Sequence, residues 1–302
     1  MPELPDLTAY VHAIRMRVVG HPLERVRIGN PFLLRSVDPP LDAFEGRVLE
    51  DVRLIGKRLV FVFPDEYFLV LHLMIAGRLH WKKAGAKVPG KVGLASFDFE
   101  AGALVLTEAG SKRRASLHAV RGLTALQAMD PGGIDVLAAS RDRFAAVLTR
   151  ERHTLKRSLT DPRLFSGIGN AYSDEILHAA QLSPMRQTHQ LDDEEISRLY
   201  AATQATLHHW IDRFLAQAKT MFPEKVTAFV DGMATHGRYG QPCPRCGTPI
   251  QRLVYAANEA NYCPTCQTGG KLLADRALSR LLREDWPKSL EDLDEYKATR
   301  KT

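Results

Sequence analysis

Four cysteines constrain this chain more than any other feature of its sequence. They are Cys243, Cys246, Cys263 and Cys266, and they form two C-x2-C pairs separated by the sixteen residues 247–262. Two cysteines three positions apart on a tight turn can direct both thiolates at one tetrahedral ion, and a second such pair completes the shell. The spacing therefore predicts one structural Zn²⁺, because four thiolates leave the metal no open position for a substrate.

The alternative use of these cysteines is in disulfide bonds, which need an oxidising compartment. The chain starts with MPELPD, which lacks the basic and apolar regions of a secretory signal. The apolar run from Phe68 to Ala76 is interrupted by His72 and is too short to cross a bilayer. We therefore expect a cytoplasmic protein with reduced cysteines.

Composition narrows the class of protein. The 302 residues suggest about two domains, and the 45% hydrophobic and 25% charged fractions are typical of a globular protein rather than a collagen-like or disordered one. Lys and Arg exceed Asp and Glu by 41 to 35, a net charge of +6. This excess favours a polyanionic partner only weakly, because many basic proteins bind no nucleic acid.

Two patterns of apolar residues divide the chain. Helical spacing near the N-terminus predicts a first helix that contains Leu7, Tyr10, Val11, Ile14 and Val18. Short β-branched and aromatic runs follow, and they predict an antiparallel sandwich or barrel from strands near 57–63, 67–73, 94–99 and 104–106.

A linker is predicted at Asp130–Gly133, which reads DPGG, and the pattern beyond it is helical. Asp192 and Glu195 have the spacing of a capping box at the start of a long helix. After the cysteines, an apolar stripe over 274–282 predicts a helical tail that packs on the helical domain or binds a partner.

Two short motifs could carry chemistry. If Met1 is removed, Pro2 becomes a secondary amine that can attack a carbonyl or sugar carbon, and Glu3 beside it could transfer protons. The sequence GIGNAY at 167–172 could bind an anion through Asn170 and the N–H groups of a helix that begins there. Taken alone, the start at Pro2 is typical of an ordinary terminus, and the GIGNAY motif is equally compatible with an ordinary helix cap.

Together and in this order, these motifs resemble the formamidopyrimidine-DNA glycosylase and endonuclease VIII family of base-excision repair enzymes. The resemblance covers about residues 1–267. It rests on PELP at 2–5, Gly56-Lys57, the GIGNAY motif with Glu175, HGR at 236–238 and the cysteine pairs. It implies an α+β protein with an N-terminal antiparallel β-sandwich with flanking helices (1–128), a helix–two-turn–helix DNA-binding domain (129–235), a four-cysteine zinc-finger hairpin (236–267) and a helical C-terminal extension (268–302).

The resemblance also implies roles for single residues. Pro2 corresponds to the amine nucleophile, Glu3 to the acid/base, and Lys57 to a lysine that binds phosphate and assists elimination. The DNA-binding positions are Arg152, Lys156, Asn170, Arg114, Ile75 and Asn258. The implied protein is a monomeric, nucleoid-associated, bacterial DNA glycosylase and AP lyase that excises oxidised bases from damaged double-stranded DNA.

Four positions depart from the family pattern. Asn258 replaces an arginine that grips a phosphate and assists the second elimination, and Ala115 stands where an aromatic side chain enters the gap left by the flipped base. Asp6 replaces a longer acid, and 36 residues follow Cys266 (302 − 266). The departures leave the second elimination open, and they leave open a protein that binds damaged or abasic DNA without turnover.

Overall fold

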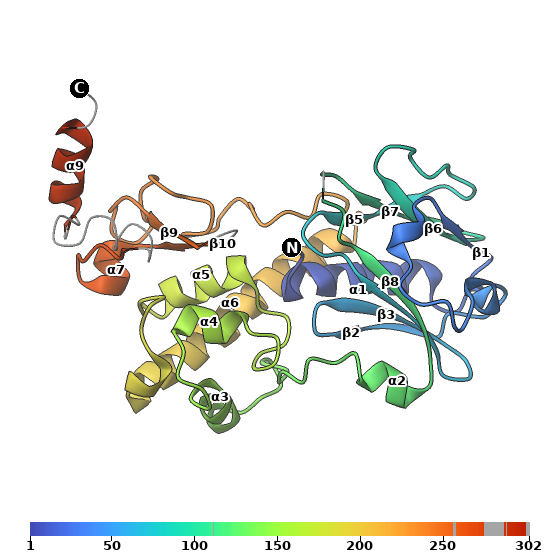
Figure 1. Ribbon diagram of the computed structural model, residues 1–302, viewed down its shortest axis with the longest axis horizontal. Coiled ribbons are helices and arrows are strands. Elements are labelled where there is room, and N and C mark those ends of the chain that lie inside the picture. The colour runs from blue at the N-terminus through green and yellow to red at the C-terminus, as the bar shows by residue number, and fades with distance from the viewer. Residues whose placement is uncertain (111, 256–257, 275–286, 288, 300–302) are drawn as a thin grey trace. The chain divides into compact units, whose positions relative to one another are not determined.

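The computed structural model describes residues 1–302 apart from 111, 256–257, 275–286, 288 and 300–302. The chain forms two compact units (Figure 1). The first unit contains Met1–Gly133 and His208–Thr227, and the second contains Ile134–Leu207 and Ala228–Thr302. The sequence predicts four segments, which is a finer division than these two units, and that division stays a prediction.

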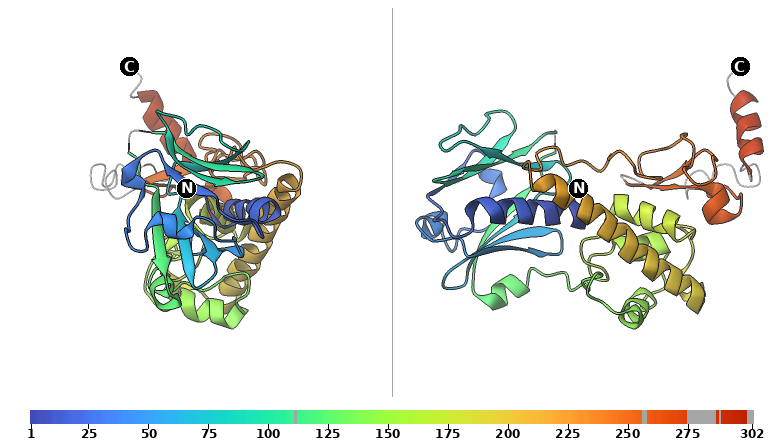
Figure 2. Two further views of the ribbon diagram at one scale, coloured as in Figure 1. Left: turned by 90° about the vertical axis from the view of Figure 1, so that its right-hand side faces the viewer. Right: turned by 180° about the vertical axis from the view of Figure 1, so that it is seen from behind.

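The first unit contains two antiparallel four-stranded sheets (Figure 2). One has the order β1-β6-β7-β5, with strands β1 (Arg25–Ile28), β5 (Gly77–Lys82), β6 (Gly93–Phe99) and β7 (Gly102–Glu108). The other has the order β2-β3-β4-β8, with strands β2 (Asp51–Ile55), β3 (Arg58–Phe63), β4 (Tyr67–His72) and β8 (Ser116–Arg121). The expected antiparallel sandwich is therefore confirmed.

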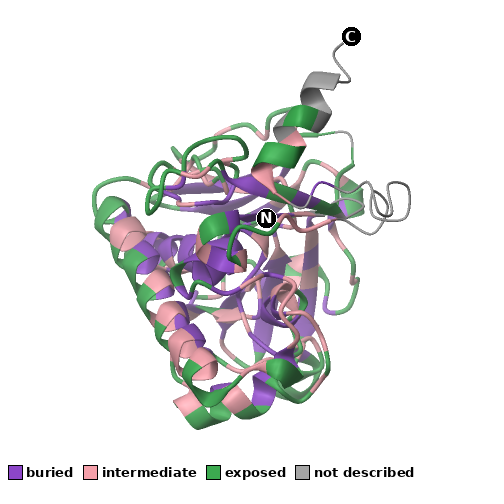
Figure 3. Cartoon of the chain, turned by 90° about the vertical axis from the view of Figure 1, so that its left-hand side faces the viewer, coloured by how far each residue is buried: buried purple, intermediate pink, exposed green. Residues whose placement is uncertain are grey.

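Apolar side chains from both sheets share one core. Figure 3 colours the chain by burial and marks its buried residues in purple. Phe61 of β3 and Phe97 of β6 stack with their ring centroids 5.6 Å apart. The five apolar residues predicted for the first helix all lie in this core, on α1 (Leu4–Val18). The outer face of the second sheet has a smaller apolar cluster with Leu126 of α2 (Leu123–Gln127). Two 3₁₀ turns, Pro31–Leu33 and Leu41–Phe44, complete the connections between β1 and β2.

The second unit is built around short helices. They are α3 (Arg141–Leu148), α4 (Leu155–Thr160) and α5 (Asn170–Ala179), followed by the 3₁₀ turn Thr188–Gln190. The long helix α6 (Asp193–Ala218) starts with the predicted capping box, because Glu195 N–H donates to Asp192 Oδ1 at 2.7 Å and Asp192 N–H donates to Glu195 Oε2 at 3.2 Å.

The cysteine region is a hairpin of β9 (Gln251–Tyr255) and β10 (Asn258–Tyr262), followed by α7 (Pro264–Thr268). Most of the predicted stripe over 274–282 lies outside the described residues. A further helix, α9 (Leu290–Thr299), follows it. Among the described helices, none combines the length and the apolar character that crossing a membrane requires.

Candidate functional site

The N-terminal residues of the first unit are held by the start of α1. Glu3 is the N-cap residue, and its N–H donates to Asp6 Oδ2 at 2.9 Å in a capping box. Both side chains are buried, with 3% of Glu3 and 5% of Asp6 exposed. The capping box therefore fixes the Glu3 carboxylate beside the chain terminus instead of leaving it on a mobile end.

Burial also sets the protonation of this terminus. It lowers the pKa of the terminal amine, here on Met1, below its usual 8.0. The negative charges of Glu3 and Asp6 raise this pKa, and the positive charges of Arg78 and Lys57 lower it. Burial raises the pKa of Asp6 from 3.8 to about 7. The environment therefore favours a neutral amine, which is the nucleophilic form.

Lys57 and His72 lie close to each other at the end of the second sheet. Lys57 follows Gly56, whose φ of +57° favours glycine. The positive charge of Lys57 lowers the pKa of His72. Burial is the main cause that brings this pKa to about 4, so His72 is neutral near pH 7. Its Nε2 is buried and lacks a hydrogen-bond partner among the described residues. The sequence singled out His72 only as the polar residue that interrupts the apolar run from Phe68 to Ala76.

Arg78 links two segments of the first unit that are distant in sequence. Its Nη1 donates to the carbonyls of Ile75 at 3.1 Å and Gly77 at 2.7 Å, and its Nε donates to the carbonyl of Val226 at 2.5 Å. Glu224 of the same segment pairs with Lys82 on β5 at 3.0 Å. Arg78 was not singled out from the sequence, because a single arginine in a strand carries no pattern.

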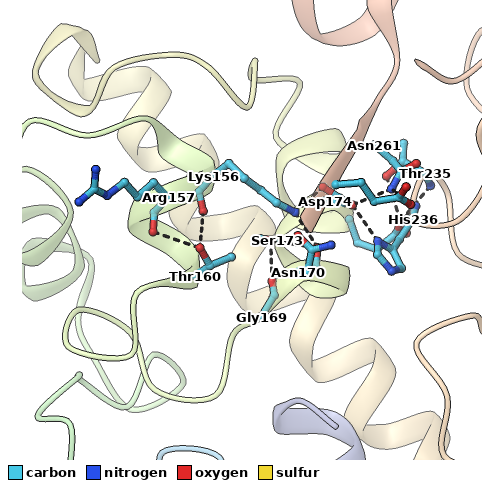
Figure 4. Close-up of polar contacts among 12 residues, drawn as sticks. Lys156, Arg157, Thr160, Gly169, Asn170, Ser173, Asp174, Thr235, His236 and Asn261 are labelled. Atoms are coloured by element: carbon cyan, nitrogen blue, oxygen red, sulfur yellow. Dashed lines mark hydrogen bonds and ion pairs between the residues drawn. The ribbon is translucent and has the colours of Figure 1, made fainter. Parts of the chain in front are cut away.

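In the second unit, Lys156 and Asn170 meet at the start of α5 (Figure 4). The Nζ of Lys156 donates to the carbonyl of Asn170 at 2.6 Å and to Oδ1 of Asp174 at 2.5 Å. Gly167 precedes the helix with a φ of +82°, which explains a glycine there. The N-terminal end of a helix carries a partial positive charge, so this arrangement can bind an anion.

The four cysteine sulfurs form one cluster. Their ligand atoms all lie within 4.8 Å of one another, with Cys243 and Cys266 at 4.0 Å and Cys246 and Cys263 at 3.4 Å. A tetrahedral Zn²⁺ with bonds of about 2.3 Å places its sulfurs roughly 3.8 Å apart. The cluster therefore fits this ion, and the donor set predicted from the sequence is brought together.

Three family models match consecutive parts of the chain. The formamidopyrimidine-DNA glycosylase N-terminal domain matches residues 1–123, the formamidopyrimidine-DNA glycosylase H2TH domain matches 133–220, and the zinc finger found in FPG and IleRS matches 240–269. An uncharacterized formamidopyrimidine-DNA glycosylase-like protein of Mycobacterium tuberculosis is 40% identical over 151 residues, which are 50% of this chain and 94% of that protein.

A solved structure extends the similarity over most of the chain. The MutM (Fpg) protein of Thermus thermophilus is 31% identical, with a TM-score of 0.75 over 88% of this chain and 98% of that one. The chain belongs to the formamidopyrimidine-DNA glycosylase family. The members of this family are DNA repair glycosylases with a zinc finger. Fpg of Lactococcus lactis, in a complex with DNA that contains an abasic site, shares the fold at 22% identity, with a TM-score of 0.78 over 88% of this chain and 99% of that one.

The turn between β4 and β5 contains Ile75, the residue predicted to act as a wedge in DNA. Met74 has a φ of +53°, and the next residue, Ile75, is 60% exposed. Arg114 is also exposed, and its N–H donates to the Glu108 carboxylate at 2.9 Å. Ala115 is 4% exposed and packs in the sandwich core, so it presents no side chain at the surface. The roles of these residues in DNA stay predictions.

The predicted departure from the family pattern at Asn258 lies in the hairpin of β9 and β10. Asn258 begins β10 opposite Tyr255, and its side chain lies outside the described residues. The neighbouring cation is Arg252 of β9, which lies 3.7 Å from Glu259 and whose guanidinium lies 4.5 Å from the ring centroid of Tyr239. Arg152 of the second unit is exposed, and its predicted contact with a DNA phosphate stays a prediction.

Proposed function

We propose that this protein is a DNA glycosylase and AP lyase that excises oxidised bases from double-stranded DNA through a Schiff base on Pro2. The observation that carries the proposal is the chain terminus, where the buried Glu3 carboxylate lies at the cap of α1 and the surroundings lower the pKa of the terminal amine, here that of Met1. The proposal requires removal of Met1, because otherwise the Pro2 nitrogen is an amide without nucleophilic character.

The chemistry follows from these groups. The Pro2 nitrogen attacks C1′ of the damaged nucleotide and the bond between C1′ and the base breaks. The leaving base takes up, through Glu3, the proton that the Pro2 nitrogen gives up. Glu3 transfers the proton that opens the sugar ring, which gives an iminium ion on Pro2. The iminium ion acidifies the C2′ proton, and its loss expels the 3′ phosphate in a β-elimination. Lys57 binds a phosphate near this centre and assists the elimination.

The remaining candidate residues hold the DNA. An enzyme that acts on a base extrudes it from the stack, and contacts to the backbone stabilise the distorted duplex. We assign phosphate contacts to Arg152, Lys156 and Asn170, and the filling of the vacated space to Ile75 and Arg114. One Zn²⁺ held by the four cysteines would stabilise the hairpin and take no part in the reaction. The protein acts as a monomer in the cytoplasm.

A second function is favoured by two departures from the family. Asn258 has no guanidinium group that could donate two hydrogen bonds to a phosphate, and Ala115 is buried. Both departures are compatible with a protein of the same fold that binds abasic DNA without catalysing a reaction. Asn258 also bears on the second elimination, and we expect products of β-elimination to dominate over those of δ-elimination.

Borohydride trapping on a duplex with one abasic site distinguishes the two functions. A Schiff base is reduced to a stable link, and mass spectrometry of the peptide then locates it on Pro2, after intact-mass measurement has shown that Met1 is absent. A control without borohydride should give no link. Binding without any trapped product would establish the non-catalytic function, and a link on another residue would overturn the role of Pro2.

A further inference from the structure

Asp174 of α5 connects three parts of the second unit (Figure 4). Its side chain is fully buried, and Oδ1 accepts from Nζ of Lys156 at 2.5 Å. Oδ2 lies 2.8 Å from Nδ1 of His236 and accepts from Nδ2 of Asn261 at 3.2 Å. These partners belong to α4, to the segment that enters the zinc finger, and to β10 of the finger hairpin.

The burial of this carboxylate makes its partners structurally important. Loss of one partner leaves a buried charge unpaired, which strongly destabilises the folded protein. The contacts of Asp174 therefore resist separation of α4, the segment that enters the finger, and β10. Lys156 is itself only 12% exposed, and its ammonium group has three N–H donors. Two are used by Asp174 and by the carbonyl of Asn170, and within the described part of the chain the third remains for a ligand. Asp174 therefore fixes the direction in which Lys156 can donate.

Glu175, the next residue of α5, holds the same segment through its backbone. Its carboxylate accepts from the backbone N–H groups of Ala234 at 2.6 Å, Thr235 at 2.9 Å and His236 at 2.9 Å. The His236 backbone is thus fixed by Glu175, and its ring is paired with Asp174. Any displacement of the segment at the entry to the finger must move the partners of Asp174 as well.

We propose that Asp174 is a positioning residue for the phosphate site of Lys156 and Asn170, and that it couples this site to the zinc finger through His236 and Asn261. The inference rests on the proposed function, because it takes the ligand of Lys156 to be a DNA phosphate. Asp174 touches no DNA. It acts by holding the Lys156 ammonium group at the start of α5. Through its hydrogen bonds to His236 and Asn261, it also fixes the position of the finger on the same helix.

The positioning role of Asp174 and simple electrostatics predict opposite effects of its removal on the affinity for DNA. Removal of a negative charge from a DNA-binding protein should strengthen its attraction to DNA. Asp174→Asn should instead weaken binding to a duplex with a tetrahydrofuran abasic analogue by on the order of tenfold, as the loss of a hydrogen bond to a charged group does. The slope of log Kobs against log salt should become shallower by about 0.9, the value for one lost phosphate contact.

Asp142→Asn is the matched control, since it removes the same charge from a side chain that is 90% exposed on α3. We expect its binding to be unchanged or slightly tighter. A double-mutant cycle separates positioning from general damage: in a Lys156→Gln background, Asp174→Asn should cause no further loss of affinity. A purely structural role would weaken binding equally in both backgrounds.

His236→Phe provides a second test if Asp174→Asn does not fold. It removes the donor to Asp174 but keeps a ring to stack on Phe229, whose centroid lies 5.7 Å away. We expect a loss of affinity of about threefold with an unchanged zinc content. Wild-type affinity and salt slope in both variants, or in His236→Phe alone where Asp174→Asn fails to fold, would overturn the proposal. Failure of the wild type to bind the duplex would instead overturn the proposed function.

Discussion

The Nε2 atom of His178 lies 3.2 Å from Sγ of Cys243, so helix α5 reaches the cysteine cluster with a buried side chain. Gln267 makes a second connection from the finger, because its Nε2 donates to the carbonyl of Leu182 at 2.9 Å. Residues that hydrogen-bond to metal ligands orient them and raise metal affinity. His178 therefore belongs to the surroundings of the zinc site, although it is far from the cysteines in sequence.

His178→Phe should weaken zinc binding by about tenfold, the lower end of the effect of losing such a partner. The ring keeps the volume of the buried site while the hydrogen bond to Cys243 is lost. Zinc released to a chromogenic chelator, measured as a rate in the absence of DNA, tests this expectation. His189→Phe, at an exposed position, is the control. Equal release rates for all three proteins would contradict the role of His178.

Glu3→Gln should abolish release of a damaged base while some cleavage of a preformed abasic site persists. The amide cannot transfer the proton that base loss and ring opening need, but the Pro2 amine can still form a Schiff base at an aldehyde. Product analysis on a panel of lesion-bearing duplexes, with Pro2→Gly assayed in parallel, measures the two steps separately. Base release by Glu3→Gln at the wild-type rate would exclude the proposed role of Glu3.

Asp6 should give the fold a pH dependence opposite to that of most carboxylates. Burial raises its pKa from 3.8 to about 7, so the folded state binds a proton that the unfolded chain has released. The stabilising contribution is complete below pH 3.8 and is lost as the pH rises through about 7. Asp6→Asn, which stays neutral, should gain a few degrees in Tm relative to the wild type between pH 5 and pH 8. A pH-independent difference in Tm would show that Asp6 does not titrate in this range.

Arg78→Met should loosen the segment that precedes Ala228. Three carbonyls, including that of Val226, lose their donor, while the methionine side chain keeps part of the apolar contact. Trypsin should then cleave after Lys219 and Lys225 several-fold faster under native conditions, because proteolysis follows local opening. Arg53→Met on β2, an exposed position, should leave these rates unchanged. Identical cleavage of both variants would show that Arg78 does not hold the segment.

The amino-acid sequence by itself determined the features that depend on local spacing. The period of apolar residues predicted α1 and four of the eight strands of the sandwich, namely β3, β4, β6 and β7. The Asp192–Glu195 spacing predicted the start of α6, and the two cysteine pairs predicted the cluster of four sulfurs. The helix, strand and capping signals each lie within a few residues, where local geometry decides which side chains meet. The two cysteine pairs are sixteen residues apart, and their meeting was predicted from the preference of a structural Zn²⁺ for four ligands.

Only the tertiary structure decided the contacts between distant residues. The meeting of Lys156 with Asp174, of Asp174 with His236 and Asn261, and of His178 with Cys243 depends on how α4, α5 and the finger pack within one unit. Sequence spacing carries no information about such pairs, because the chain between them can close a loop at little additional entropic cost whatever its length. The same holds for the burial of Ala115 in the sandwich core and of the Nε2 atom of His72 on β4.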